Sequence, residues 1–473
     1  MNKENKGPYL VTGAAGFTGG HMVRWLAANG YSVRVFVRDA AQFKKLGLKE
    51  VEIAEGDLKN EKSIRAAIKG TAGVFHIAAL FRKAGLPDSE YYEVNVEGTR
   101  RLLNAAVEEG VPRFIHCSTI GVQGHIENPP AKESDPYNPG DIYQVTKMEA
   151  EKLALRTFKE GKIRGVVIRP AMIYGPGDTR LLKLFSMLSK GRFFYVGAGD
   201  KYVHFIDVRD LVAAFGRAME LNHLNAEVYT IGGKRALPLN EAVEIICEQL
   251  GVRRPWLHLP VKPVQLLGTI CEAICTPLRI NPPIYRRRVD FFTKDRHFDC
   301  SKARQQLGFQ PSKDLEEEIA DIIDWYYAYG MLVPKKPNSS TLLRTVEGKV
   351  TRWDTLAEKT YGFSKEMAEG NISHDLFKTE FPCSLEQINR ELLRSGSWKG
   401  PLVHTKRDGS KLRVESRWEL RNDGDNGAPY VLEINLPDEG DTVEPILAPV
   451  ENVVGAFAYP FSLNEVATLL QCV

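Results

Sequence analysis

Short apolar runs alternate with amphipathic stretches along the first third of the chain. We predict strands where four such runs occur, at residues 9–11, 31–38, 51–58 and 73–79. Residues 62–68 and 94–109, which follow the third and fourth runs, place their apolar side chains at helical spacing. Strands that alternate with helices in this way predict an α/β fold with a doubly wound parallel sheet.

A second pattern begins after a change of composition. Residues 334–340 are rich in proline, lysine and small polar side chains, which is typical of a linker. Beyond them, residues 412–420 alternate between apolar and polar side chains and predict a strand. We therefore expect a domain over 1–333, the linker 334–340, a second domain over 341–437 and a tail over 438–473.

The bulk composition is that of a soluble globular protein. The 473 residues are 43% hydrophobic and 26% charged, and the net charge of +3 argues against a nucleic-acid partner. Seven scattered cysteines indicate a reducing compartment rather than a disulfide framework. The start of the chain is polar, without the apolar core of a signal peptide, and no apolar run is long enough to span a membrane. We therefore expect a cytoplasmic protein.

Three glycines follow the first predicted strand, at positions 13, 16 and 19. Gly13 would allow a tight turn, and Gly16 would allow the backbone to approach a pyrophosphate closely. Gly19 would allow the next helix to pack closely against the sheet, and the N-terminus of that helix would hold the diphosphate. The strand–turn–helix context favours a dinucleotide site over a turn that merely collects glycine. The residues expected to contact the cofactor here are Gly13, Ala15, Gly16, Phe17, Thr18 and Gly19.

The end of the second predicted strand bears on the choice of cofactor. An acidic residue at this point binds the ribose hydroxyl of NAD, whereas an arginine accommodates the 2′-phosphate of NADP. Arg38 ends the strand and Asp39 follows it. This order favours NADP over NAD, although Arg38 could equally be a solvated charge at the end of a strand.

Several motifs resemble the extended short-chain dehydrogenase/reductases of the NAD-dependent epimerase/dehydratase superfamily. They are TGAAGFTG at 12–19, GDL at 56–58, HIAA at 76–79 and NVEGT at 95–99. The resemblance implies a Rossmann cofactor part over about 7–165 and a substrate lobe mostly over 166–330. It also implies cofactor contacts from Asp57, Leu58, Ala78, Ala79, Asn95, Pro170 and Ile173.

Tyr143 and Lys147 are four residues apart on a predicted helix, so they lie on the same helix face. A nearby ammonium favours the phenolate, which lets a tyrosine exchange a proton with a substrate oxygen as hydride moves. By the resemblance, these two are the catalytic pair and also contact the cofactor. Thr119 would bind the substrate oxygen, although the register also allows its neighbour Ser118.

The substrate is expected to be apolar. Relatives that act on nucleotide-sugars have an asparagine where this chain has Met172, and the surrounding residues are more similar to 3β-hydroxysteroid dehydrogenases and dihydroflavonol reductases. We expect Leu80, Met172 and Tyr174 to line the substrate pocket. The apolar stretch within 264–288 is either a lid of the substrate lobe or a surface that touches a membrane.

The second domain resembles a PAS domain, a sensory module with a five-stranded antiparallel sheet. The match begins with residues 350–366 and passes through HDL at 374–376, WKGPLVH at 398–404 and KRDGS at 406–410. Such modules bind a small ligand or pair with another copy, so we expect a homodimer and leave the ligand unknown. His374 or His404 could ligate haem, but we expect no metal in this protein.

Two alternatives to a dehydrogenase stay open. One is a nucleotide-sugar epimerase or dehydratase with tightly bound NAD, against which Met172 and Arg38 both argue. The other is a redox sensor that binds the cofactor without turnover and signals through the PAS domain. A sensor would be expected to lack the pair of Tyr143 and Lys147, which this chain keeps.

Overall fold

The chain forms two compact units in a computed structural model. The structure describes residues 7–44, 48, 51–83, 85–275, 286–329, 331–332, 340–421 and 429–437. The first unit comprises residues 1–249 and 253–321, and the second comprises mainly residues 322–462. Each unit is described by itself below.

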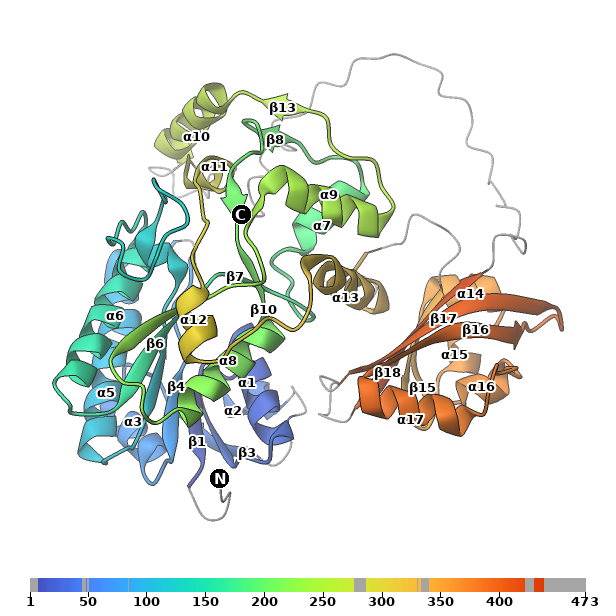
Figure 1. Ribbon diagram of the computed structural model, residues 1–473, viewed down its shortest axis with the longest axis horizontal. Helices are drawn as coiled ribbons and strands as arrows, with labels where there is room; N and C mark the ends of the chain where they lie inside the picture. The colour runs from blue at the N-terminus through green and yellow to red at the C-terminus, as the bar shows by residue number, and fades with distance from the viewer. Residues whose placement is uncertain are drawn as a thin grey trace. The chain divides into compact units, whose positions relative to one another are not determined.

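A seven-stranded parallel sheet forms the centre of the first unit (Figure 1). Its strands are β1 (Tyr9–Thr12), β2 (Val33–Val37), β3 (Val51–Glu55), β4 (Gly73–His76), β5 (Phe114–Cys117), β6 (Gly165–Pro170) and β11 (Glu227–Ile231). They lie in the order β11-β6-β5-β4-β1-β2-β3 and every neighbouring pair is parallel. The predicted doubly wound sheet is therefore confirmed, and its order reverses between β1 and β4.

Helices cover both faces of this sheet, so its strands are almost wholly apolar. One face packs against α1 (Phe17–Ala28) and α8 (Val208–Glu220), through a core that includes Val23, Phe75 and Phe215. The other face packs against α3 (Glu61–Ile68), α5 (Gly98–Glu108) and α6 (Ile142–Lys159), around Phe114 and Phe158. A π-helix, η1 (Tyr92–Glu97), precedes α5, and a short helix, α4 (Asp88–Tyr91), precedes it in turn.

The remainder of the first unit consists of short strands and helices that follow β6. Strand β7 (Met172–Tyr174) pairs in parallel with β10 (Phe205–Asp207). The helices here are α7 (Leu182–Ser189), α9 (Leu239–Leu250), α10 (Val261–Cys275), α11 (Arg286–Thr293), α12 (Ser301–Gln306) and the first half of α13 (Leu315–Ala328). The apolar stretch predicted within 264–288 falls on α10 and α11, and residues 276–285 lie outside the described residues. None of the described helices combines the length and apolar character needed to cross a membrane.

The second unit contains a five-stranded antiparallel sheet in the order β15-β14-β18-β17-β16 (Figure 1). The strands are β14 (Ser340–Thr345), β15 (Val350–Trp353), β16 (Ser397–Thr405), β17 (Lys411–Arg421) and β18 (Tyr430–Pro437). Helices α14 (Thr355–Tyr361), α15 (Lys365–Ala368), α16 (Ser373–Leu376) and α17 (Leu385–Ser395) lie between β15 and β16 in the chain, and side chains from them join one core with the inner face of the sheet. This architecture is compatible with the expected α+β domain.

The boundary between the units differs from the expected linker. The division falls between Asp321 and Ile322, inside α13, because Tyr329 beyond the end of that helix packs against Leu343 and Tyr430 on the outer face of the second sheet. The first strand of this sheet already begins at Ser340, the last residue of the predicted linker. Residues 333–339 and the tail 438–473 lie outside the described residues.

Candidate functional site

The glycine-rich turn joins β1 to α1 with little space around its backbone. Gly13 has a φ of +73°, and a Cβ on Gly19 would lie only 2.1 Å from the carbonyl oxygen of Gly13. Gly16 precedes the first turn of α1, and no side chain caps that turn. The first N–H groups of α1 are therefore available to an anion, as a dinucleotide site requires.

Thr12 ties this turn to the end of β4. Its Oγ1 accepts hydrogen bonds from the backbone N–H groups of Ile77 and Ala78, both at 3.1 Å. A Cβ on Gly13 would lie 2.9 Å from the Cα of Ala78. The predicted cofactor residues Gly13, Ala78 and Ala79 thus meet where the strand order reverses, which is where ligands bind in open α/β sheets.

A buried hydrogen-bonded chain continues from Thr12 and was not predicted from the sequence. Thr99 donates to the carbonyl of Asn95 (2.6 Å), so its oxygen accepts from Nε2 of His76 (2.8 Å), while Nδ1 of His76 accepts from Thr12 (2.9 Å). Burial, with the nearby Lys147, lowers the pKa of His76 to about 3. His76 is therefore a neutral connector between the glycine-rich turn and η1.

Asn95 extends the chain to the loop after β4 and to α6. Its Oδ1 accepts from the N–H of Leu80 (2.7 Å), and its Nδ2 donates to the carbonyl of Leu80 (3.2 Å) and to Oγ1 of Thr146 (3.0 Å). Asn95 is 2% exposed. Asn95, for which a cofactor contact is predicted, thus holds the loop after β4 against α6.

The residues that bear on the ribose lie at the ends of β2 and β3. Arg38 is exposed and forms no ion pair with any described residue, whereas Asp39 accepts from the N–H of Gln42 (2.8 Å) in α2 (Ala40–Lys44). Asp57 accepts from the N–H of Lys59 (2.9 Å), and Leu58 is buried in the core. At the end of β2, the guanidinium of Arg38 is therefore exposed and not engaged in an ion pair with a described residue.

The N-terminal turns of α6 carry the predicted catalytic pair. Asp141 caps the helix by accepting from the N–H of Gln144 (2.8 Å). Lys147 is 3% exposed, and its Nζ donates to the carbonyl of Cys117 at the end of β5 (2.6 Å). Desolvation lowers the pKa of Lys147 and raises that of the Tyr143 phenol. The phenol is therefore protonated at neutral pH in the protein alone.

Ser118 and Thr119 have different surroundings, which the sequence left open. Ser118 is buried, and its hydroxyl donates to Oε2 of Glu151. Thr119 is half-buried and caps η2 (Ile120–Gln123) by accepting from the N–H of Gly121 (3.1 Å). Because η2 contacts α6, Thr119 lies beside the helix that carries Tyr143, and its side chain is the more accessible of the two.

Glu151 is the centre of a buried cluster that sequence reasoning missed. Besides Ser118, it binds Tyr137 (2.8 Å) and a fork of two nitrogens from Arg169 (Nη2 at 2.6 Å). Arg169 also donates to the carbonyl of Glu133 (3.0 Å). These partners are far apart in the sequence, so no local pattern could have indicated them.

The residues expected at the substrate pocket and beside the nicotinamide come from the loop after β4 and from β6 and β7. Leu80, Met172 and Ile173 are half-buried, whereas Pro170 is buried. Tyr174 is fully buried, and its hydroxyl binds Glu318 of α13. Tyr174 therefore packs inside the unit and does not face an open pocket. Desolvation raises the pKa of Glu318 to about 8.

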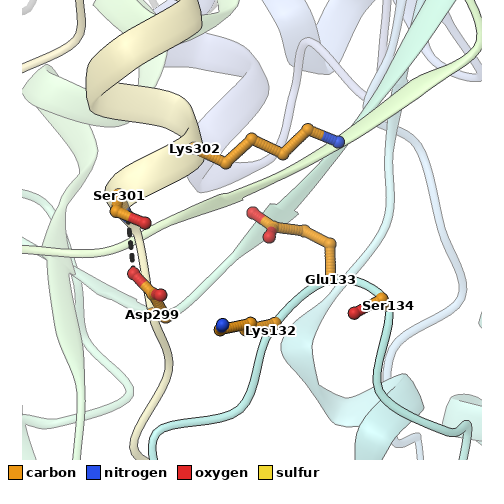
Figure 2. A pocket seen from close by; sticks show the side chains of 6 residues that line it. All are labelled: Lys132, Glu133, Ser134, Asp299, Ser301 and Lys302. Atoms are coloured by element: carbon orange, nitrogen blue, oxygen red, sulfur yellow. Dashed lines mark hydrogen bonds between the residues drawn. The ribbon is translucent and has the colours of Figure 1, made fainter.

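A separate polar cavity of about 290 Å³ opens elsewhere on the first unit (Figure 2). It is lined by Lys132, Glu133, Ser134, Asp299, Ser301 and Lys302. Two of its charged groups have partners in the protein, since Lys302 pairs with Glu227 (2.6 Å) and Asp299 accepts from the N–H of Ser301 (2.8 Å). None of the predicted site residues lines this cavity.

The inner face of the second sheet also buries polar groups. Nδ1 of His404 bonds to the hydroxyl of Tyr361 (2.8 Å), and its ring stacks on Phe377 with centroids 4.5 Å apart. Burial lowers the pKa of His404 to about 4. His374 is less deeply placed, and no cluster suited to a metal ion occurs among the described residues of either unit.

Comparison with known proteins reveals relatives over the first two thirds of the chain. Residues 9–232 match the model of the NAD dependent epimerase/dehydratase family. Sterol demethylase protein B of Methylococcus capsulatus is 31% identical over 336 residues, which cover 68% of this chain and 99% of that protein. The 3beta-hydroxysteroid-dehydrogenase/decarboxylase isoform 1 of Arabidopsis thaliana is 30% identical, and the match covers 67% of this chain and 78% of that protein.

Solved structures agree with the fold of the first unit. MoeE5 in complex with UDP-glucose and NAD superposes with a TM-score of 0.54 at 28% identity, covering 68% of this chain and 99% of that one. That neighbour binds NAD, and its match is again confined to about two thirds of the present chain.

Proposed function

Because the chain belongs to the NAD-dependent epimerase/dehydratase family, we propose that its first unit is a dehydrogenase acting on an apolar secondary alcohol or ketone. The nicotinamide cofactor would accept hydride from the alcohol or donate it to the ketone. Tyr143 would exchange the proton with the substrate oxygen, Lys147 would favour its phenolate, and Thr119 would bind the same oxygen.

The observation that carries the proposal is the buried ammonium of Lys147, one helical turn from Tyr143. Among the described residues, Lys147 forms a hydrogen bond only with the carbonyl of Cys117 and has no carboxylate partner. Glu151 acts on this cation only through a longer-range electrostatic attraction, so the burial of Lys147 is costly, and such groups are concentrated at functional sites. Because burial raises the pKa of Tyr143, its phenol is set to donate a proton to a ketone oxygen.

The cofactor would lie over the glycine-rich turn, with its diphosphate at the uncapped N-terminus of α1. Two observations support NADP over NAD, namely the free guanidinium of Arg38 and the use of the Asp39 carboxylate as a helix cap. Asp57 and Leu58 would lie beside the adenine of the cofactor. Pro170 and Ile173 would lie beside its nicotinamide.

An apolar substrate is supported by the half-buried Met172 and Leu80 and by the relatives whose names refer to sterols. A nucleotide-sugar epimerase is the second candidate, favoured by the neighbour that binds UDP-glucose. Met172 at the position of the expected asparagine argues against it. For the second unit we propose a PAS domain that regulates the enzyme or pairs two copies of the chain, which is supported by its five-stranded antiparallel sheet.

The test is nicotinamide absorbance with NADP(H) and NAD(H), against one panel of apolar alcohols and ketones and another of nucleotide-sugars. We expect net turnover of an apolar compound and a loss of about 10²–10⁴-fold in Tyr143→Phe. Cofactor affinity should be retained in this variant, and Tyr92→Phe, an exposed tyrosine, serves as the matched control. Epimerised nucleotide-sugar without net turnover would replace the proposal by the second candidate.

A further inference from the structure

Phe81 is an exposed aromatic residue beside the proposed catalytic tyrosine. Its ring centroid lies 4.9 Å from that of Tyr143, and the two rings meet edge to face at 84°. Phe81 is 51% exposed, whereas phenylalanine side chains in folded proteins are more often buried.

The backbone around Phe81 is held firmly on both sides. Leu80 is bound through its N–H and its carbonyl by the buried Asn95. Arg82 donates from Nε to Asp141 (3.0 Å), the residue that caps α6. The exposure of Phe81 is therefore built into an anchored segment.

We propose that Phe81 is a specificity-determining residue that packs against the carbon skeleton of an apolar substrate next to its reacting carbonyl. The inference rests on the proposed function, because a substrate oxygen bonded to the Tyr143 hydroxyl brings the attached carbons close to the Phe81 ring. Covering an exposed aromatic ring with apolar carbon gives binding free energy that grows with the buried area. Phe81 therefore favours large apolar substrates over small ones.

The test compares Phe81→Ser, Phe81→Leu and the control Leu393→Ser, which alters an exposed apolar residue on α17 of the second unit. Each variant is assayed with ketones that grow from one ring to several fused rings. We expect Phe81→Ser to lower kcat/KM by about 10–100-fold for the largest ketone, mainly through KM, and by less than about threefold for the smallest. Phe81→Leu should restore most of this loss, and Leu393→Ser should change kcat/KM for neither ketone.

An equal loss for all ketones, or no loss at all, would overturn the inference. The same variants are also titrated with a fluorescent naphthalene probe in the presence of the cofactor. If no compound is turned over but Phe81→Ser binds the probe at least about tenfold more weakly, Phe81 still binds apolar carbon beside Tyr143 and the dehydrogenase proposal fails. If apolar ketones are turned over and Phe81→Ser leaves both discrimination and probe affinity unchanged, the proposal stands and the inference fails.

Discussion

Both units contain a deeply buried arginine–glutamate pair, Arg169–Glu151 in the first and Arg344–Glu433 in the second, and the two pairs differ in how completely their polar atoms are satisfied. In the first unit, Glu151 binds Arg169, and its two oxygens also accept from Ser118 and Tyr137. In the second unit, Arg344 binds Glu433 at 2.8 Å, but Nη2 of Arg344 has no partner among the described residues. Nε2 of His404, on the same inner face, is also without a partner.

The buried polar groups around the two pairs also lie at different positions in their sheets. In the parallel sheet the polar groups bound to Glu151 lie at the carboxyl ends of β5 and β6, where they border the candidate site. In the antiparallel sheet the buried polar groups cross the middle of the inner face, where Ser416 donates to Asn435 (2.6 Å) and Trp418 donates to Ser416 (3.0 Å). Buried polar groups in such a place are stable only as a network.

The largest expected effect comes from breaking one partner of each pair. Arg344→Met and Arg169→Met should each lower the free energy of unfolding by about 3–5 kcal/mol, because a buried carboxylate loses its counter-ion. The double variant Arg344→Met/Glu433→Leu should recover most of the loss. Arg169→Met/Glu151→Leu should recover less, since the hydroxyls of Ser118 and Tyr137 lose their acceptor. Urea unfolding followed by circular dichroism measures the free energy of unfolding of all four variants. If the two double variants regained the same free energy, the predicted difference between the two pairs would be wrong.

Glu318 extends the comparison, because this buried carboxyl of the first unit forms no ion pair with any residue that the structure describes. Its folded pKa of about 8 lies above the ordinary value of 4.5, so the folded protein holds a proton that the unfolded chain releases. Stability should therefore fall as pH rises from about 4.5 to 8, by up to about 1.4 kcal/mol per pH unit. Glu318→Gln should flatten this dependence in thermal unfolding. If the stability of Glu318→Gln depended on pH as steeply as that of the unaltered protein, Glu318 would be ionised in the folded state.

A smaller effect separates backbone packing from side-chain packing. A Cβ on Gly19 would meet the Gly13 carbonyl at 2.1 Å, whereas one on Gly400 in the second sheet would meet the side chain of Trp398 at 2.7 Å. Gly19→Ala should cost about 1–3 kcal/mol and weaken cofactor binding, because the backbone cannot yield as a side chain can. Gly20→Ala, whose Cβ has ordinary contacts, is the control. Calorimetric titration with NADP measures the cofactor affinity of both variants, and Gly19→Ala should bind NADP more weakly than Gly20→Ala. Equal affinities for the two variants would contradict this prediction.

The sequence predicted the parallel sheet well, because period and spacing are local properties. The turn at Gly13, the helix after Gly16 and the common face of Tyr143 and Lys147 all follow from neighbours within a few positions. The choice between Ser118 and Thr119 could not be made in this way. It depends on Glu151, which is 33 residues away from Ser118 and reaches it only because α6 packs on β5.

What the sequence determined by itself is the set of elements and the spacing of chemical groups within each of them. Only the tertiary structure decided which groups meet, because crossover connections bring together residues that no local pattern relates. Tyr174, expected at the pocket, is thereby bound to Glu318, 144 positions away, whereas Phe81 is exposed next to Tyr143. The physical reason is that periodicity fixes the face on which a side chain lies, while burial and hydrogen-bond partners depend on the segments that cover that face.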